Sequence, residues 1–350
     1  MESTAFAQHS ASQPIRPLTR KDLRDLERVP KTKLQTTWDH CLCVMPLLAG
    51  CLAMAEYHLV PNLPGNLSGS VYSGFIVILM TVIASVYYVA LRRQEVFDAL
   101  RHKAPFYSFI FLVLALYDYL TLKTGVLLLP YFPWVDQVLT AMVTDWRYLA
   151  ECSLGSLHLL FTGYCTGAAL GLATGIACGY SRRVNYWVAP FMKLLGAIPP
   201  TTWLPVVMVL AASLFSGSVF IIALGVWFAV TLATLTGVSN IDKSYFETAR
   251  VLGASGPQLV FRIAFPFALP SIFQGLTQGM SSACTALLVA EMIGVESGLG
   301  WYISWQKSWA QYGKMYAAIV LICVIFVLVN AALGLLRKRV LIWQEGLVAG

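Results

Sequence analysis

The polar side chains that interrupt the long apolar runs of this sequence are the first candidates for chemistry. Gln274 and Gln278 lie one helical turn apart, so both amides would share a helix face and could donate hydrogen bonds to an oxyanion. A neutral amide can solvate an anion without holding it tightly. Hydrogen bonding between helices is the alternative explanation for these two residues.

Two carboxyl groups also lie inside apolar runs, where an ionisable side chain is costly and is a candidate for function. Asp118 lies between Tyr117 and Tyr119, so a local hydrogen-bonded role is as well supported as exposure to a pathway. Glu291 lies near the end of its apolar run and is interpreted as a helix anchor or a gating group. With Gln274 and Gln278, these are the candidate pathway or gate residues.

No arrangement typical of an enzyme or a metal centre accompanies them. The eight cysteines include no CxxC pair, and the five histidines show no metal-ligand spacing. The sequence has no Ser-His-Asp or paired-carboxylate pattern and no GxxxxGK[ST] phosphate-binding loop. We therefore expect no catalytic residue, no metal and no cofactor on this chain.

The elements that must position these residues are membrane-spanning helices. The sequence is 58% hydrophobic and only 12% charged, about half the charged share of a soluble protein. A span needs about 20 mostly apolar residues. Eight segments satisfy that rule: 41–60, 71–91, 106–127, 153–179, 187–211, 218–238, 268–292 and 315–336. Pro199, Pro200 and Pro205 interrupt the fifth, which should therefore face the protein interior or a pathway.

The distribution of Lys and Arg predicts the orientation of these spans. Most of the 24 basic residues lie in the tail before the first span and in alternate loops, which predicts that both termini are cytoplasmic. Because the net charge of +7 is sorted in this way, it does not indicate a nucleic-acid partner. The tail, residues 1–39, is expected to contain one short helix at 18–29.

Two longer outer segments are expected to lie along the membrane surface. Residues 130–150 have the pattern of an amphipathic helix, and residues 293–313 carry Trp301, Trp305 and Trp309 on one helical face. Anchoring in the lipid headgroups and docking of an outside partner explain these tryptophans equally well.

A row of glycines predicts close helix packing in the fourth span. Glycine recurs there at every fourth residue, which places the missing side chains on one ridge and lets another backbone approach closely. The sequence leaves open whether the partner helix belongs to this chain or to a second copy. The five residues are Gly163, Gly167, Gly171, Gly175 and Gly179.

The loop at 239–266 contains cap and turn residues that are typical of a helix, a turn and a second helix. Ser244-x-x-Glu247 fits a capping box, and Gly253 is the residue type favoured in the left-handed position after a helix. Ser255 to Gln258 offers a second cap with proline in the first turn, and Pro266 and Pro270 are expected to end the second helix. A stiff helical pair is thus predicted between two spans.

This loop resembles the signature of the permeases of binding-protein-dependent ATP-binding-cassette (ABC) importers. The family pattern is Glu-Ala-Ala, three residues, Gly, nine residues, Ile, one residue and Leu-Pro, from which Thr248 and Phe265 depart. The resemblance covers roughly residues 107–345 and is closest to the branch that imports nitrate, taurine, sulfonates and related anions. The residues it marks for coupling to an ATPase are Ser244, Glu247, Thr248, Ala249, Gly253, Ala254, Ile263 and Pro266.

The resemblance implies an all-α integral membrane protein whose last six helices form a type I ABC importer permease core. Residues 1–39 would be a cytoplasmic tail, 40–104 two additional spans, and 105–345 the permease domain. It implies a homodimer in the bacterial inner membrane, two ATPase subunits that hold ATP and Mg, and an extracytoplasmic binding protein. A small anion would cross by alternating access.

Two functions of other classes compete with this interpretation. A carrier or channel driven by an ion gradient needs no docking loop for an ATPase, and the capped loop argues against it. A membrane-embedded enzyme or an assembly scaffold is the other alternative. The sequence assigns no role to the first two spans.

Overall fold

The computed structural model of this protein describes residues 33–66 and 68–342 of the 350-residue chain. These residues form an all-α protein, as the sequence predicts. Within them, seven helices are long and apolar enough to cross a membrane, and a bent pair of helices makes eight if it forms one span. Most of the predicted tail, with its short helix at 18–29, lies outside the described residues.

The chain divides into two compact units. The first contains α2 (Lys33–Leu59) and most of α3 (Val71–Ala90) and α4 (Gln94–Asp118). In this unit Cys43, Ala90, Phe97 and Leu100 form a small buried cluster, and Arg101 Nε lies 2.7 Å from Asp39 Oδ1. Apolar contacts and one ion pair therefore connect α2 with α4.

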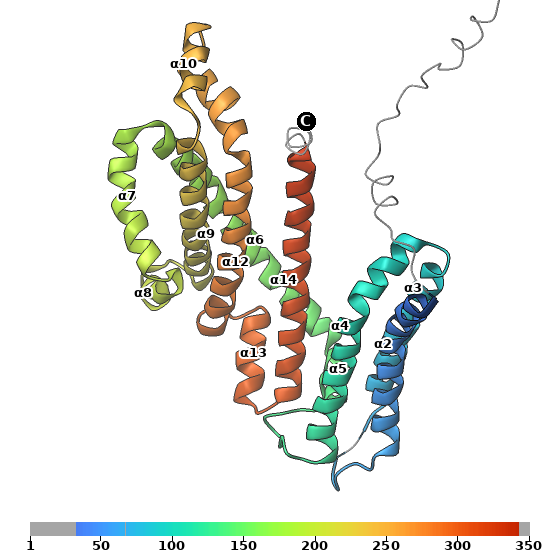
Figure 1. Cartoon of the computed structure of the whole chain (residues 1–350). Coiled ribbons are helices and arrows are strands. Elements are labelled where there is room, and N and C mark those ends of the chain that lie inside the picture. The colour runs from blue at the N-terminus through green and yellow to red at the C-terminus, as the bar shows by residue number, and fades with distance from the viewer. Residues whose placement is uncertain (1–32, 67, 343–350) are drawn as a thin grey trace, which may run out of the picture. The chain divides into compact units, whose positions relative to one another are not determined.

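The second unit contains residues 61–73 and the chain from Tyr117 onward. Figure 1 shows α10 at one end of this unit, beyond α9 and α12, and α13 at the opposite end. Its elements are η1 (Tyr119–Lys123), α5 (Val135–Thr144), α6 (Trp146–Tyr180), α7 (Arg182–Ala197), η2 (Pro200–Trp203), α8 (Leu204–Leu210), α9 (Leu214–Ser239), α10 (Lys243–Val251), α11 (Gly256–Gln258), η3 (Leu259–Ala264), α12 (Phe265–Ile293), α13 (Leu299–Ser308) and α14 (Tyr312–Val340).

The glycine row of α6 packs against α9 of the same chain, which answers the question that the sequence left open. A methyl group built on any of the five glycines would meet α9 at less than an ordinary contact distance. The five glycines face, in order, Ile222, Val226, Val230, Thr234 and Val238. Glycine at every fourth position of α6 therefore lets the branched side chains of α9 rest on its backbone.

This register also determines how the chain passes between α6 and α9. Both partners advance by four residues at each contact, so the two helices run parallel. The chain must then return from the end of α6 to the start of α9 through α7, η2 and α8, which are bent by 91° at their break. The bent pair is therefore a broken span that crosses the unit, and the break falls at Pro199 and Pro200, as the sequence indicates.

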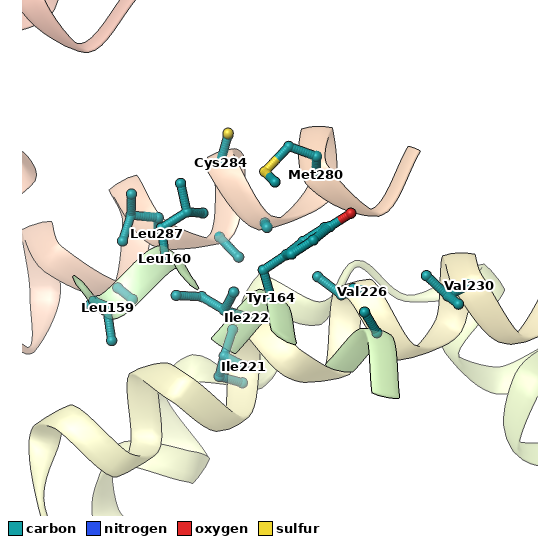
Figure 2. Close-up of a cluster of buried hydrophobic side chains, with 14 of the residues drawn as sticks. Leu159, Leu160, Tyr164, Ile221, Ile222, Val226, Val230, Met280, Cys284 and Leu287 are labelled. Carbon is teal, nitrogen blue, oxygen red and sulfur yellow. The ribbon is translucent and has the colours of Figure 1, made fainter. Parts of the chain in front are cut away.

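The main core lies where α6, α9 and α12 meet (Figure 2). Leu160, Ile222 and Leu287, one from each helix, are almost completely buried. Tyr164 of α6 adds a polar connection, because its hydroxyl donates a hydrogen bond of 3.0 Å to the Leu276 carbonyl of α12. This core holds the helix that carries the predicted glutamines.

Several helices begin earlier than the apolar runs predict. The largest differences are in α4, which begins at Gln94 and not at 106, and in the helix expected at 268, which is continuous from Gly256. Hydropathy marks only the part of a helix that suits hydrocarbon, so it misses polar turns beyond that part. The single helix expected at 130–150 is in fact two, because α5 and α6 are separated at Asp145.

The outer segment with the tryptophans is helical, as expected. Trp301 and Trp305 stack in α13 with ring centroids 5.4 Å apart, and Trp309 follows directly after the helix. Asp145 connects this segment with its neighbours, because its Oδ2 accepts from the Tyr302 hydroxyl at 3.0 Å and lies 2.8 Å from Lys314 Nζ. The pKa of Tyr302 is raised, first by burial and then by Asp145.

Candidate functional site

The loop after α9 forms the helix and turn that the sequence predicts, but with a different N-terminal cap. Asp242, not Ser244, is the cap, and its Oδ1 accepts the Ser244 N–H at 3.0 Å. That bond lowers the pKa of Asp242 below its ordinary value. Ser244 lies inside the helix, so the predicted Ser244–Glu247 capping box is wrong. Asp and Ser cap about equally well, and the local backbone decides between them.

The other end of α10 closes with a glycine turn, as predicted. Gly253 has φ +82° and lies directly after the C-cap Leu252. Its N–H bonds to the Arg250 carbonyl at 3.0 Å, and the Ala254 N–H bonds to the Ala249 carbonyl at 2.9 Å. These two bonds are a Schellman motif, which satisfies carbonyls that the helix leaves free. The nine-residue helix is therefore capped at both ends.

The second helix of the loop does not end at Pro266 or Pro270, contrary to the prediction. α11, η3 and α12 form one helix from Gly256 to Ile293, with the Ser255 N–H bonded to Gln258 Oε1 at 2.8 Å at its start. A proline removes one helical hydrogen bond and crowds the carbonyl four residues earlier. The turn before Pro266 is a π-helix, and its wider spacing accommodates the ring.

The exposed tip of α10 is apolar. Phe246 packs against Val238 and Ala264, which fixes one face of the helix to its neighbours. At the C-terminal end of α10, Val251 and Leu252 are 88% and 81% exposed. Large apolar side chains so exposed outside a predicted span indicate a contact surface for another protein.

The residues predicted for coupling form two groups in this loop. Exposed members are Ser244, Glu247, Thr248 and Gly253, and half-buried members are Ala249, Ala254, Ile263 and Pro266. The exposed group lies on α10 and its C-terminal turn, and the half-buried group extends from α10 to the start of α12. Their role in coupling stays a prediction.

A cavity of about 560 Å³ lies among α7, η2, α9 and α12. Gln274 and Gln278 line it, as do Pro199 and Pro200 of the broken span. Neither glutamine side chain makes a hydrogen bond to the described part of the chain, which argues against a role in hydrogen bonding between helices of the same chain. The two amides are exposed in the single chain and can contact a solute.

The cavity has further polar residues that were not predicted from the sequence. Thr236 of α9 and Ser271 and Ser282 of α12 also line it, and none of its lining residues is charged. Ser282 follows Gln278 by four residues, so helical spacing from the glutamines was a usable signal. Thr236 gave no such signal, because only the packing of α9 against α12 brings it to the same cavity.

The two predicted carboxylates do not line this cavity. Asp118 is completely buried at the end of α4. Glu291 is buried at the end of α12, where its Oε2 accepts the Gly300 N–H at 2.8 Å. A side chain on Gly298, which has φ +111°, would collide with the Glu291 carboxylate. The carboxylate of Glu291 in α12 is therefore hydrogen-bonded to the first turn of α13.

Replacing Glu291 with leucine should lower the free energy of unfolding by about 1–3 kcal/mol, because the buried Gly300 N–H would lose its acceptor. Glu291→Gln keeps an oxygen acceptor and should lose less. Thermal unfolding of the two detergent-purified variants measures the difference. Equal losses would mean that the hydrogen bond to Gly300 is not what Glu291 contributes.

The fold and the site together define a polytopic membrane protein that has an uncharged, partly polar cavity among its spans and a capped helical loop between two of them. Residues 168–342, half of the chain, match the family described as binding-protein-dependent transport system inner membrane component. The chain belongs to this family, and the resemblance found in the sequence is confirmed. A transport component, not an enzyme, is what this family describes.

Two relatives and one solved structure illustrate the similarity. The chain is 31% identical over 111 residues to a protein named as an aliphatic sulfonates transport permease of Bacillus subtilis, and 30% identical over 111 residues to a nitrate import permease of Synechocystis. Each match covers 32% of this chain and 40% of the relative. A crystal structure of an amino acid ABC transporter aligns over 57% of this chain and 95% of that chain, with 17% identity and a TM-score of 0.48.

Proposed function

We propose that this chain is the membrane-spanning permease subunit of an ATP-driven importer for a small anion, located in the bacterial inner membrane with both termini cytoplasmic. Two copies would enclose the pathway, and a binding protein would deliver the solute from outside. ATP and Mg would be held by two partner ATPase subunits. The observation that carries this proposal is the capped helix α10 with its exposed apolar tip.

The geometry of the loop suits the transmission of force. α10 is fixed to the start of the long helix Gly256–Ile293 through Phe246 and through the Gly253 turn. That helix continues without interruption from Gly256 to Gln278, which lies roughly 33 Å from Gly256 at 1.5 Å per residue. A partner that displaces α10 would therefore move the wall of the cavity, which is the motion that alternating access requires.

The cavity supports a small, weakly held anion as the solute. Its amides and hydroxyls can donate hydrogen bonds, and without a charged group it would release an anion readily. The named functions of the two relatives, sulfonate and nitrate transport, belong to the same chemical class. Gln274 and Gln278 are exposed in the single chain, and polar groups at this depth should face water or protein instead of lipid. A second copy would provide that cover.

The proposal is tested by replacing the apolar tip. Val251→Ser combined with Leu252→Ser should abolish co-purification of ATP hydrolysis with the tagged chain, because the contact surface loses its apolar area. Leu59→Ser is the control, since Leu59 is 80% exposed but lies at the end of α2. ATPase activity that co-purifies equally with both variants would contradict docking at α10. If the unaltered chain carries no ATPase, an ion-gradient carrier becomes the better assignment.

A further inference from the structure

A groove of about 440 Å³ lies between α3 and α4 in the first unit. Its walls are apolar along most of their length. They include Leu79, Val82 and Val86 from α3 and Val96, Ala99 and Ile110 from α4. Both helices are candidate membrane spans, and only 11% of the apolar part of α3 is buried within the protein. The walls of this groove therefore suit an occupant that supplies hydrocarbon.

Two polar side chains interrupt the apolar wall. Lys103 and Tyr107 lie one turn apart on α4, and both line the groove. Lys103 forms no ion pair with the described part of the chain, and the Tyr107 hydroxyl makes no hydrogen bond to it. An unpaired ammonium beside an apolar groove requires an anionic partner or access to water.

We propose that the α3–α4 groove binds one anionic phospholipid, with an acyl chain along the apolar wall and the phosphate held by Lys103 and Tyr107. The occupant must supply hydrocarbon and a negative charge in one molecule, and an anionic phospholipid does so. Basic pockets between spans at the cytoplasmic side of a membrane have this preference. Arg92 and Arg93 precede α4 and place this end of the groove at the predicted cytoplasmic surface.

The surrounding charges are consistent with this assignment. Arg101, two residues before Lys103, is already paired with Asp39. The acidic residues of this part of α4, Glu95 and Asp98, have interactions of their own and do not line the groove. Lys103 is therefore the one charged side chain that the described residues present to the groove.

Native mass spectrometry of the full-length chain in detergent tests the proposal with phosphatidylglycerol and phosphatidylethanolamine of identical acyl chains. The unaltered chain should retain phosphatidylglycerol about fivefold more than phosphatidylethanolamine, the preference expected from one lysine near the phosphate. Lys103→Gln should bring that ratio close to one. Arg93→Gln, which removes the same charge outside the groove, should leave it unchanged.

A second variant examines the apolar wall. Ala99→Phe should fill the groove and reduce retention of both lipids, with little effect on the ratio. Glycerol phosphate, which has no acyl chain, should not bind to the unaltered chain. Equal retention of the two lipids, a preference lost in Arg93→Gln but kept in Lys103→Gln, or undiminished binding to Ala99→Phe would overturn the proposal. So would a second copy of the chain that displaces the lipid from this groove.

Discussion

Replacing Gly167 with leucine is expected to prevent stable folding of the second unit, so that little of the protein accumulates in the membrane. The position has no room for any side chain. A Cβ atom on Gly167 would collide with the Ala223 carbonyl oxygen and would lie 2.9 Å from Ala223 Cα and 2.8 Å from Val226 Cβ. Two of these atoms belong to the backbone of α9, so relief would require the helix itself to move.

The effect should grow with the size of the substituent. Gly167→Ala adds one carbon atom, and overpacking of this kind lowers the free energy of unfolding by about 1–3 kcal/mol. Leucine adds three more carbon atoms and would separate α6 from α9 at Val226, a residue of the main core. Because the main core depends on this contact, the cost should exceed the stability of the unit.

Gly334 provides a matched control for this prediction. It also lies inside a long apolar helix, α14, but a Cβ atom there meets nothing within 4 Å. Gly334→Ala should leave stability unchanged or raise it by up to about 1 kcal/mol, since alanine favours helix. Membrane levels and thermal unfolding midpoints of the variants measure these effects. A Gly167→Leu protein as abundant and as stable as the Gly334→Ala protein would show that the close contact with α9 is dispensable.

The glycine row of α6 could be predicted from the sequence as a packing surface, but the helix that packs on it could not. The four-residue spacing in α6 was sufficient to predict a packing ridge, because helical geometry alone places those positions together. The partner could not be predicted, since its side of the contact consists of ordinary branched residues such as Val226 and Val230. Those residue types occur throughout apolar spans and give no pairing signal.

Local signals in the loop succeeded where only one residue type fits the required backbone. Gly253 was predicted to adopt a positive φ, and it does so at +82°. The predicted N-terminal cap was wrong because aspartate and serine cap helices about equally well, so residue type alone does not distinguish Asp242 from Ser244. The end of the second helix was wrong because a π-helical turn lets Pro266 continue a helix that proline usually ends. Such a turn depends on the packing around it and leaves no mark in the sequence.

The candidate site was predicted in part for a related reason. Gln274 and Gln278 were conspicuous because amides are rare in spans, and both line the cavity. Asp118 and Glu291 were conspicuous on the same grounds but are buried away from it. A polar residue in an apolar run indicates a need for a hydrogen-bond partner, which a neighbouring backbone can supply as well as a solute.

Under the proposed function, replacing Gly253 with valine is expected to reduce solute uptake roughly tenfold while the protein remains folded. A left-handed backbone costs an L-residue about 1–2 kcal/mol, and about 1.4 kcal/mol changes the population of the native turn tenfold. A Cβ atom at this position meets nothing within 4 Å, so the whole effect arises from backbone strain. The two bonds that depend on the turn, from Gly253 N–H and Ala254 N–H, would be lost with it.

Two further variants isolate the turn as the cause of that loss. Gly253→Asn should keep most of the uptake, because asparagine tolerates a positive φ better than other residues. Gly256→Ala, three residues away at the start of the next helix, has no positive φ and no close contact, so its uptake should be unchanged. Uptake into proteoliposomes that contain the proposed partner ATPase, normalised to the amount of inserted protein, measures all three. In the proposed mechanism α10 transmits force only while this turn holds it against the helix that follows. Undiminished uptake by the valine variant would therefore contradict coupling of an ATPase through α10.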